Sequence, residues 1–115
     1  MGLLPEKIKI GCRTYEVIFP YVFQEDNNRV GQECTTLCEI RVAGDVSGQA
    51  IPRDSLAQIL FHEVLHAIDH ASNLGICAGE DGQTDEAKVD GLAEWLCMVL
   101  RDNPEFTKLF LERKP

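Results

Sequence analysis

Hydrophobic and polar residues alternate with a period of two in the first third of the chain, a pattern typical of half-buried β-strands. Ile8 and Ile10 alternate with lysines, and the segment Tyr15–Phe19 beyond a glycine turn is β-branched and aromatic. This pattern predicts a β-hairpin that Pro20 closes. A further strand is predicted over Thr35–Val42, and its charged outer face indicates an exposed edge of the sheet.

The period lengthens to that of an α-helix after Pro52, whose missing N–H is harmless at a helix start. Apolar residues then recur on one side of a helix that we expect to run to about Asn73, with Gly75 as its end signal. A second helix is predicted to begin near Thr84, a suitable N-cap residue, and to stop at Asn103 before a proline. A last short helix is expected to pack back through Phe106, Leu109 and Phe110.

These elements predict an α+β fold with a small antiparallel or mixed N-terminal sheet of about three strands, followed by helices. The 115 residues contain no internal repeat or linker and have the length of a single domain, 1–115. The hydrophobic share of 44% and the charged share of 26% are those of an ordinary globular protein. The five cysteines are an odd number, so we expect reduced thiols rather than a disulfide framework.

The net charge of the chain argues against two classes of binding partner. A net charge of -8 argues against binding to nucleic acid or to an anionic membrane, because both require a basic surface. No apolar run approaches the about 20 residues that span a bilayer, and the first residues lack the apolar core of a secretory signal. We therefore expect a cytoplasmic protein.

The first predicted helix contains the motif H-E-x-x-H, formed by His62, Glu63 and His66. Residues four apart lie one turn apart on the same helix face, so both imidazoles can reach one metal ion. Tetrahedral zinc takes such nitrogens at about 2.0–2.1 Å. Glu63 lies about 100° round the helix from His62, where it can act as general base on a zinc-bound water without being a ligand.

The third ligand must come from elsewhere, since a catalytic zinc site usually has three protein ligands and a water. His70 lies about 12 Å along the helix axis from His62 and is expected to be a surface or supporting histidine. Glu86, at the start of the second helix, is expected to point toward the core, where a metal would compensate its charge. Asp85 is the alternative ligand if the helix phase is shifted by one residue. Asp90, one turn after Glu86, is placed to accept the outer N–H of a ligating histidine.

The two helix motifs together resemble a known family. The pattern His62-Glu63-x-x-His66, followed by Glu86-x-x-x-Asp90, resembles that of the gluzincins, the thermolysin-like zinc metallopeptidases. Residues 60–68 and 92–104 are similar to the very small metallopeptidases of phages and prophages. The resemblance implies a minimal zincin-like domain with one Zn²⁺ per chain, in the cytoplasm of the host cell if the protein is phage-encoded. It makes His62, His66 and Glu86 the ligands, Glu63 the base and Asp90 the outer partner.

The function expected from this pattern is zinc-dependent hydrolysis of peptide bonds. A protein or peptide substrate is expected to bind along the edge strand Thr35–Val42. Larger gluzincins supply a histidine or tyrosine that stabilises the oxyanion, but neither residue type follows His70 here. Tyr15 and Tyr21, in the strand region, are the candidates that the sequence offers.

Two other functions fit the same residues. The chain could be a zincin scaffold that binds zinc and regulates a protein partner without hydrolysis. It could also be a metal-free helical interaction protein in which the H-E-x-x-H motif is accidental.

Overall fold

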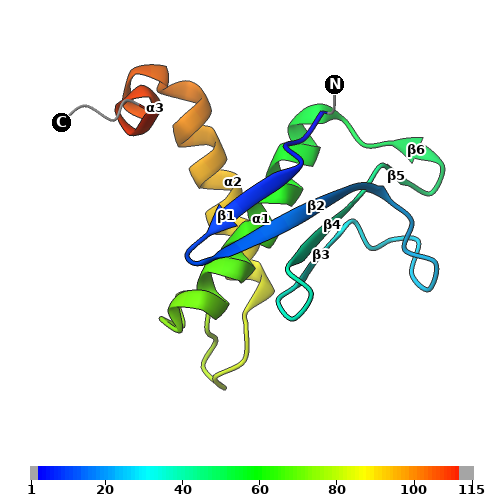
Figure 1. Cartoon of the computed structure of the whole chain (residues 1–115), viewed down its shortest axis with the longest axis horizontal. Helices are drawn as coiled ribbons and strands as arrows, with labels where there is room; N and C mark the ends of the chain where they lie inside the picture. The colour runs from blue at the N-terminus through cyan, green and yellow to red at the C-terminus, as the bar shows by residue number, and fades with distance from the viewer. Residues whose placement is uncertain (1–2, 112–115) are drawn as a thin grey trace.

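The computed structural model describes residues 3–111 and places the strands before the helices, as Figure 1 shows. The strands are β1 (Lys7–Ile10), β2 (Arg13–Tyr21), β3 (Gly31–Cys34), β4 (Glu39–Ala43), β5 (Asp45–Val46) and β6 (Gln49–Ala50). The helices are α1 (Arg53–Ser72), α2 (Glu86–Asp102) and α3 (Pro104–Leu111). The predicted α+β class is therefore confirmed.

The main sheet is mixed and has four strands in the order β1-β2-β4-β3. β1 and β2 form the predicted antiparallel hairpin, which pairs Ile8 with Tyr15 and turns at Gly11. Gly11 has a φ of 64°, a conformation that glycine adopts without steric cost. β2 continues through Pro20 to Tyr21, so the prediction that Pro20 closes the hairpin is wrong. β2 then pairs in parallel with β4, and β5 and β6 form a separate two-stranded hairpin.

The predicted edge strand Thr35–Val42 is wrong in its first half and in its position. Residues 35–38 form a tight turn, in which the Cys38 amide donates to the Thr35 carbonyl and Cys38 adopts a φ of 52°. β4 begins only at Glu39 and lies inside the sheet, between β2 and β3. Its charged residues lie on one side of an interior strand, where the Arg41 guanidinium contacts the Glu39 carboxylate at 2.8 Å. The alternation of charged and apolar residues therefore indicated the two faces of the sheet, not its edge.

The edge strand next to the helices is β3, which the sequence analysis missed. β3 has β4 on one side only, because it ends the strand order of the sheet. Its residues, Gly-Gln-Glu-Cys, include no β-branched or aromatic side chain, so local propensity gives no strand signal. Pairing with β4 over Gly31–Cys34 forms the strand instead.

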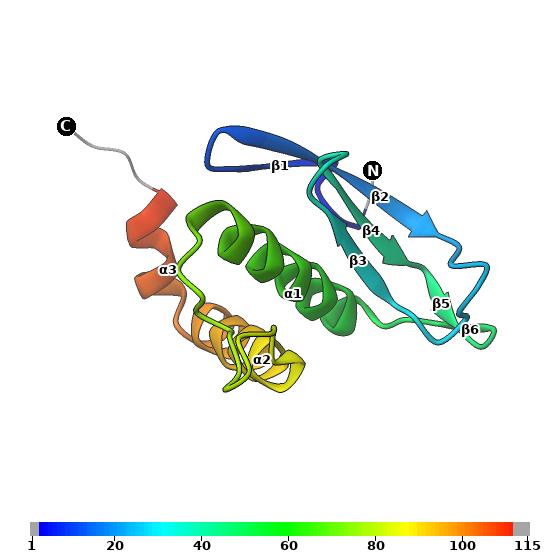
Figure 2. The same ribbon diagram turned by 90° about the horizontal axis from the view of Figure 1, so that it is seen from below.

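α1 lies between the sheet and α2, and the three form successive layers in Figure 2. Its apolar side packs on the sheet, and the buried core consists of Ile10, Tyr15, Ile40, Val42, Leu56, Leu60 and Ala67. α1 begins after Pro52 and ends at Asn73, which has a left-handed conformation and donates from its amide to the Asp69 carbonyl. The predicted helix therefore lies within one or two residues of the observed one.

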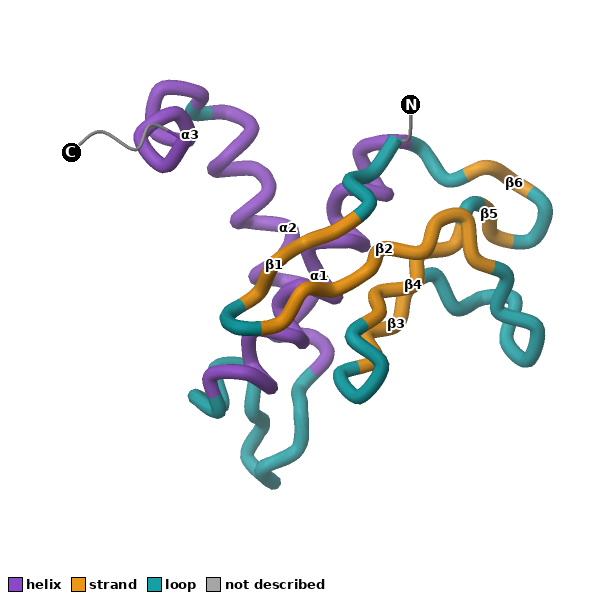
Figure 3. The backbone as a smooth tube through the Cα atoms, in the orientation of Figure 1, coloured by secondary structure: helices purple, strands orange, loops and turns teal. Residues whose placement is uncertain are grey.

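The long loop between α1 and α2, teal in Figure 3, leads to an N-cap that differs from the prediction. Asp85, not Thr84, caps α2, and its carboxylate accepts from the Ala87 amide at 3.0 Å. α2 packs on α1 through Val89 and Ala93, both fully buried.

α3 is the predicted last helix, and it packs against the end of α2, where the Thr107 hydroxyl donates to the Leu100 carbonyl at 2.7 Å. Phe106 and Phe110 contact each other edge to face and remain exposed, so the expected apolar packing is incomplete. Within residues 3–111, no helix is long and apolar enough to cross a membrane. All five cysteines belong to this range and carry free thiols, as predicted.

Candidate metal centre

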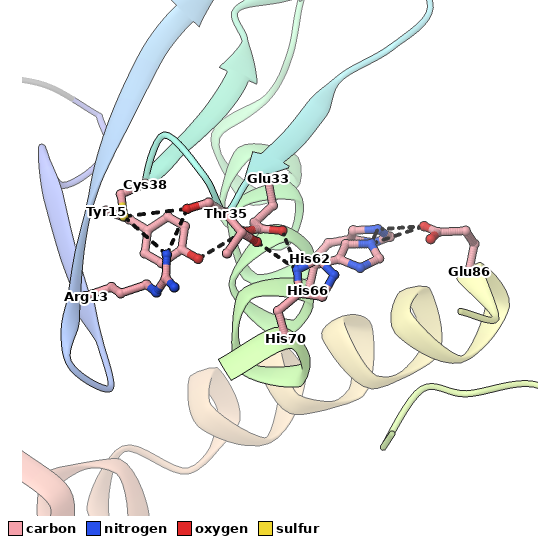
Figure 4. Close-up of polar contacts among 9 residues, drawn as sticks. All are labelled: Arg13, Tyr15, Glu33, Thr35, Cys38, His62, His66, His70 and Glu86. Atoms are coloured by element: carbon pink, nitrogen blue, oxygen red, sulfur yellow. Dashed lines mark hydrogen bonds and ion pairs between the residues drawn. The ribbon is translucent and has the colours of Figure 1, made fainter. Parts of the chain in front are cut away.

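Two histidines of α1 and the first residue of α2 converge on one point, as Figure 4 shows. His62 and His66 lie one turn apart on the same face of α1, so their rings point in the same direction. Their Nε2 atoms are 3.2 Å apart. Glu86 Oε1 lies 3.1 Å from His62 Nε2 and 3.3 Å from His66 Nε2. The structure thus brings together the three residues that the sequence analysis named as ligands.

The spacing of these three atoms fits a tetrahedral ion. Two ligand atoms bonded to zinc at about 2.0–2.1 Å with tetrahedral angles lie about 3.3 Å apart. The three observed separations are 3.1, 3.2 and 3.3 Å. Two imidazole nitrogens and one carboxylate oxygen are also the donor types that zinc accepts. His62, His66 and Glu86 would therefore hold such an ion with little rearrangement.

The outer side of His62 gives a second indication of a cation. His62 Nδ1 lies 2.7 Å from Asp90 Oδ1, which is the contact predicted for Asp90. A carboxylate accepts hydrogen bonds, so this contact assigns the proton of the neutral ring to Nδ1 and leaves a lone pair on Nε2. That lone pair faces the Glu86 carboxylate at 3.1 Å, and two acceptors at this distance repel each other unless a cation or a proton lies between them.

Two details of the third ligand differ from the expectation. Glu86 does not point into the core; its side chain is 62% exposed, because it begins α2 at the rim of the site. Asp85 does not belong to the group of three candidate ligands, because its carboxylate caps α2 through the Ala87 amide. Glu86 therefore lies beside the two histidines, but not for the predicted reason: the start of α2 beside α1 places it there, not burial.

Glu63 lies beside the three candidate ligands, in a nearly closed environment. The residue is 7% exposed, and its carboxylate packs against the edge strand β3 at Gly31. A Cβ atom at Gly31 would lie 2.7 Å from Glu63 Oε2, so a larger residue at this position would require the Glu63 carboxylate to shift. Burial of the carboxyl group raises the pKa of Glu63 to about 7. This pKa belongs to the metal-free chain, and a cation bound at the neighbouring histidines would lower it by favouring the carboxylate form.

A cleft of about 930 Å³ connects these groups. β3 and the loop before it form one wall, and α1 and the start of α2 form the other. The three candidate ligands, Glu63 and Asp90 all line the cleft, together with Arg29 and His70. The three candidate ligands therefore face a cleft between β3 and the helices.

The tyrosines suggested as oxyanion donors do not reach this cleft. Tyr15 is 1% exposed, and its hydroxyl donates to Glu33 Oε2 at 3.0 Å. Tyr21 lies elsewhere, with its ring 4.7 Å from Phe23 and 5.2 Å from the guanidinium carbon of Arg41. Neither tyrosine lines the cleft that contains the histidines.

Three further residues shape the site without any signal in the sequence: Gly31, Glu33 and Thr35. Glu33 Oε1 lies 3.1 Å from His70 Nδ1, and Thr35 Oγ1 lies 2.8 Å from the same atom. These contacts join residues 35 to 37 positions apart, so no local pattern predicts them.

Comparisons of the chain with models of protein families, with curated proteins and with solved structures found no match in any of the three.

Proposed function

We propose that this protein is a zinc-dependent peptide-bond hydrolase with a minimal zincin-like fold. In this proposal His62, His66 and Glu86 hold one Zn²⁺ per chain, and Glu63 is the general base. The observation that carries the proposal is the convergence of three ligand atoms at tetrahedral spacing beside a buried carboxylate, all in one open cleft. The H-E-x-x-H motif supports it, because the motif is typical of metallopeptidases.

Each residue of the site has a separate role in the proposed reaction. A bound zinc ion supplies Lewis-acid chemistry, since it lowers the pKa of a bound water toward about 7 and polarises a carbonyl oxygen. The Glu63 carboxylate accepts a proton from the attacking water and then returns it to the leaving amine. Asp90 keeps the His62 ring in the orientation and tautomer that present Nε2 to the site.

The open edge of β3 is the surface proposed for the substrate. It replaces the segment Thr35–Val42, which is not an edge strand. A peptide that adds to β3 as a further strand would use backbone hydrogen bonds and would pass directly over Glu63, because Gly31 lies against that carboxylate.

The test is hydrolysis of an unfolded protein, casein, by the zinc-loaded chain and by Glu63→Gln. We expect the variant to keep its zinc and to lose about 10²–10⁴-fold in rate, because the amide cannot accept the proton. Full activity of the Glu63→Gln variant would exclude Glu63 as the general base. A wild-type protein that binds zinc but cleaves nothing would favour the zinc-binding module that regulates a partner.

A further inference from the structure

A second carboxylate–imidazole pair lies one helical turn beyond His66. Its members are Glu33, on the edge strand β3, and His70, near the end of α1. In Figure 4 this pair lies on the opposite side of His62 and His66 from Glu86. The function proposed above does not use it.

The Glu33 carboxylate is held by several donors in a buried position. Its side chain is only 3% exposed. Oε2 accepts from the Tyr15 hydroxyl at 3.0 Å and from the Thr35 hydroxyl. Oε1 faces His70 Nδ1 at 3.1 Å. A carboxylate fixed in this way can orient an imidazole ring, as Asp90 does for His62.

The hydrogen bonds assign the proton on His70. The Thr35 hydroxyl donates to Glu33, so its oxygen offers only a lone pair to His70 Nδ1, which lies 2.8 Å away. Nδ1 therefore faces two acceptors, Thr35 Oγ1 and Glu33 Oε1, and carries the N–H. The other ring nitrogen, Nε2, is left as an acceptor.

That nitrogen is available to a ligand in the cleft. The His70 side chain is 61% exposed and lines the same cleft as His62 and His66. Nε2 has no hydrogen-bond partner among residues 3–111. Four residues of helix advance about 6 Å along the axis, which corresponds to about two residues of an extended peptide. His70 is thus spaced to meet a bound strand about two residues away from the position over His66.

We propose that His70 is a substrate-binding residue, whose Nε2 accepts a hydrogen bond from a backbone N–H of the peptide about two residues from the cleaved bond. Glu33 is a positioning residue that acts through the His70 ring. This inference rests on the proposed hydrolase function. The simpler role for the pair is to tie β3 to the end of α1, and the two roles use different ring nitrogens.

Substitutions at His70 separate the two roles. Asn can replace the Nδ1 donor toward Glu33 but places nothing at the position of Nε2, whereas Gln offers a polar group near Nε2 and loses the Nδ1 contact. With casein as substrate, we expect His70→Asn to keep zinc and thermal stability but to lose about tenfold in kcat/KM, mainly through KM, the size of one lost hydrogen bond. His70→Gln should keep more of kcat/KM and less of the stability.

The outcomes distinguish this inference from the proposed function. Wild-type kcat/KM in His70→Asn, with loss only in His70→Gln, would show a purely structural role and overturn the inference. A wild-type chain that cleaves no casein would overturn the hydrolase function and the substrate contact together. The tautomer has an independent test: ¹⁵N NMR of the wild-type protein should show the proton of the neutral His70 ring on Nδ1, and a proton on Nε2 would contradict the assignment.

Discussion

α1 and α2 carry the two halves of the candidate metal site in different surroundings. α1 lies against the sheet and buries Leu56, Leu60 and Ala67, so His62 and His66 project from a helix that the core holds in place. α2 buries only Val89 and Ala93. Its two site residues, Glu86 and Asp90, have side chains that are 62% and 69% exposed.

This difference predicts how binding of a metal would affect the stability of the fold. The histidine half of the site is built by the hydrophobic core, whereas the carboxylate half is held by a small apolar contact with α1 and by the contact of Asp90 with His62. A bound ion would therefore link α2 to α1. Substitutions in the two halves should differ in their effects on zinc affinity and on the free energy of unfolding.

The largest effect is expected from His66→Ala, which removes a ligand from the half that the core holds in place. Mass spectrometry of the metal should find well under one zinc per chain in the purified variant. It should also lose the stabilisation that zinc gives, which is about 4.1 kcal/mol when free zinc is 1,000 times the Kd of the wild-type site. Urea unfolding with zinc and with a chelator measures this difference. A variant that kept one zinc per chain would contradict the assignment of His66.

Glu86→Gln tests the α2 half, and Asp85→Asn is its matched control. Glu86→Gln should weaken zinc binding by more than the about 10–100-fold that loss of an outer partner costs. In chelator its free energy of unfolding should match that of wild type, because Glu86 contributes little to the core. Asp85→Asn should bind zinc normally, since asparagine caps a helix as well as aspartate does. Competition with a zinc indicator measures both, and the reverse result would make Asp85 the ligand.

Asp90→Asn is expected to have the smallest effect of the three. The amide can still accept from His62 Nδ1–H but no longer raises the basicity of the ring as a carboxylate does. Zinc affinity should fall about 10–100-fold with the stoichiometry unchanged. Unchanged affinity would show that the contact with His62 is incidental.

The parts of the fold that depend on local pattern were predictable from the sequence. The hairpin of β1 and β2 and the limits of α1 and α2 follow from hydrophobic period, turns and helix ends. β3 was not predictable, because Gly31–Cys34 forms a strand only through pairing with β4. The same limit applies to the edge assigned to Thr35–Val42, since the position of a strand in a sheet is a property of the whole fold.

The candidate site shows the same division. His62, Glu63 and His66 form a local motif, and Glu86 with Asp90 repeats the one-turn spacing on the next helix. The contact of Gly31 with Glu63 and that of Glu33 with His70 join distant segments and required the structure. The sequence therefore indicated the residues of the candidate metal site but not the strand that forms the opposite wall of the cleft.

The most direct test of the central claim is the zinc content of the wild-type chain, purified without an affinity tag, equilibrated with zinc and then freed of excess metal. The geometry of His62, His66 and Glu86 predicts about one tightly held zinc per chain by mass spectrometry of the metal. A chain that retains no metal after this treatment would contradict the metal centre, and with it the proposed hydrolase.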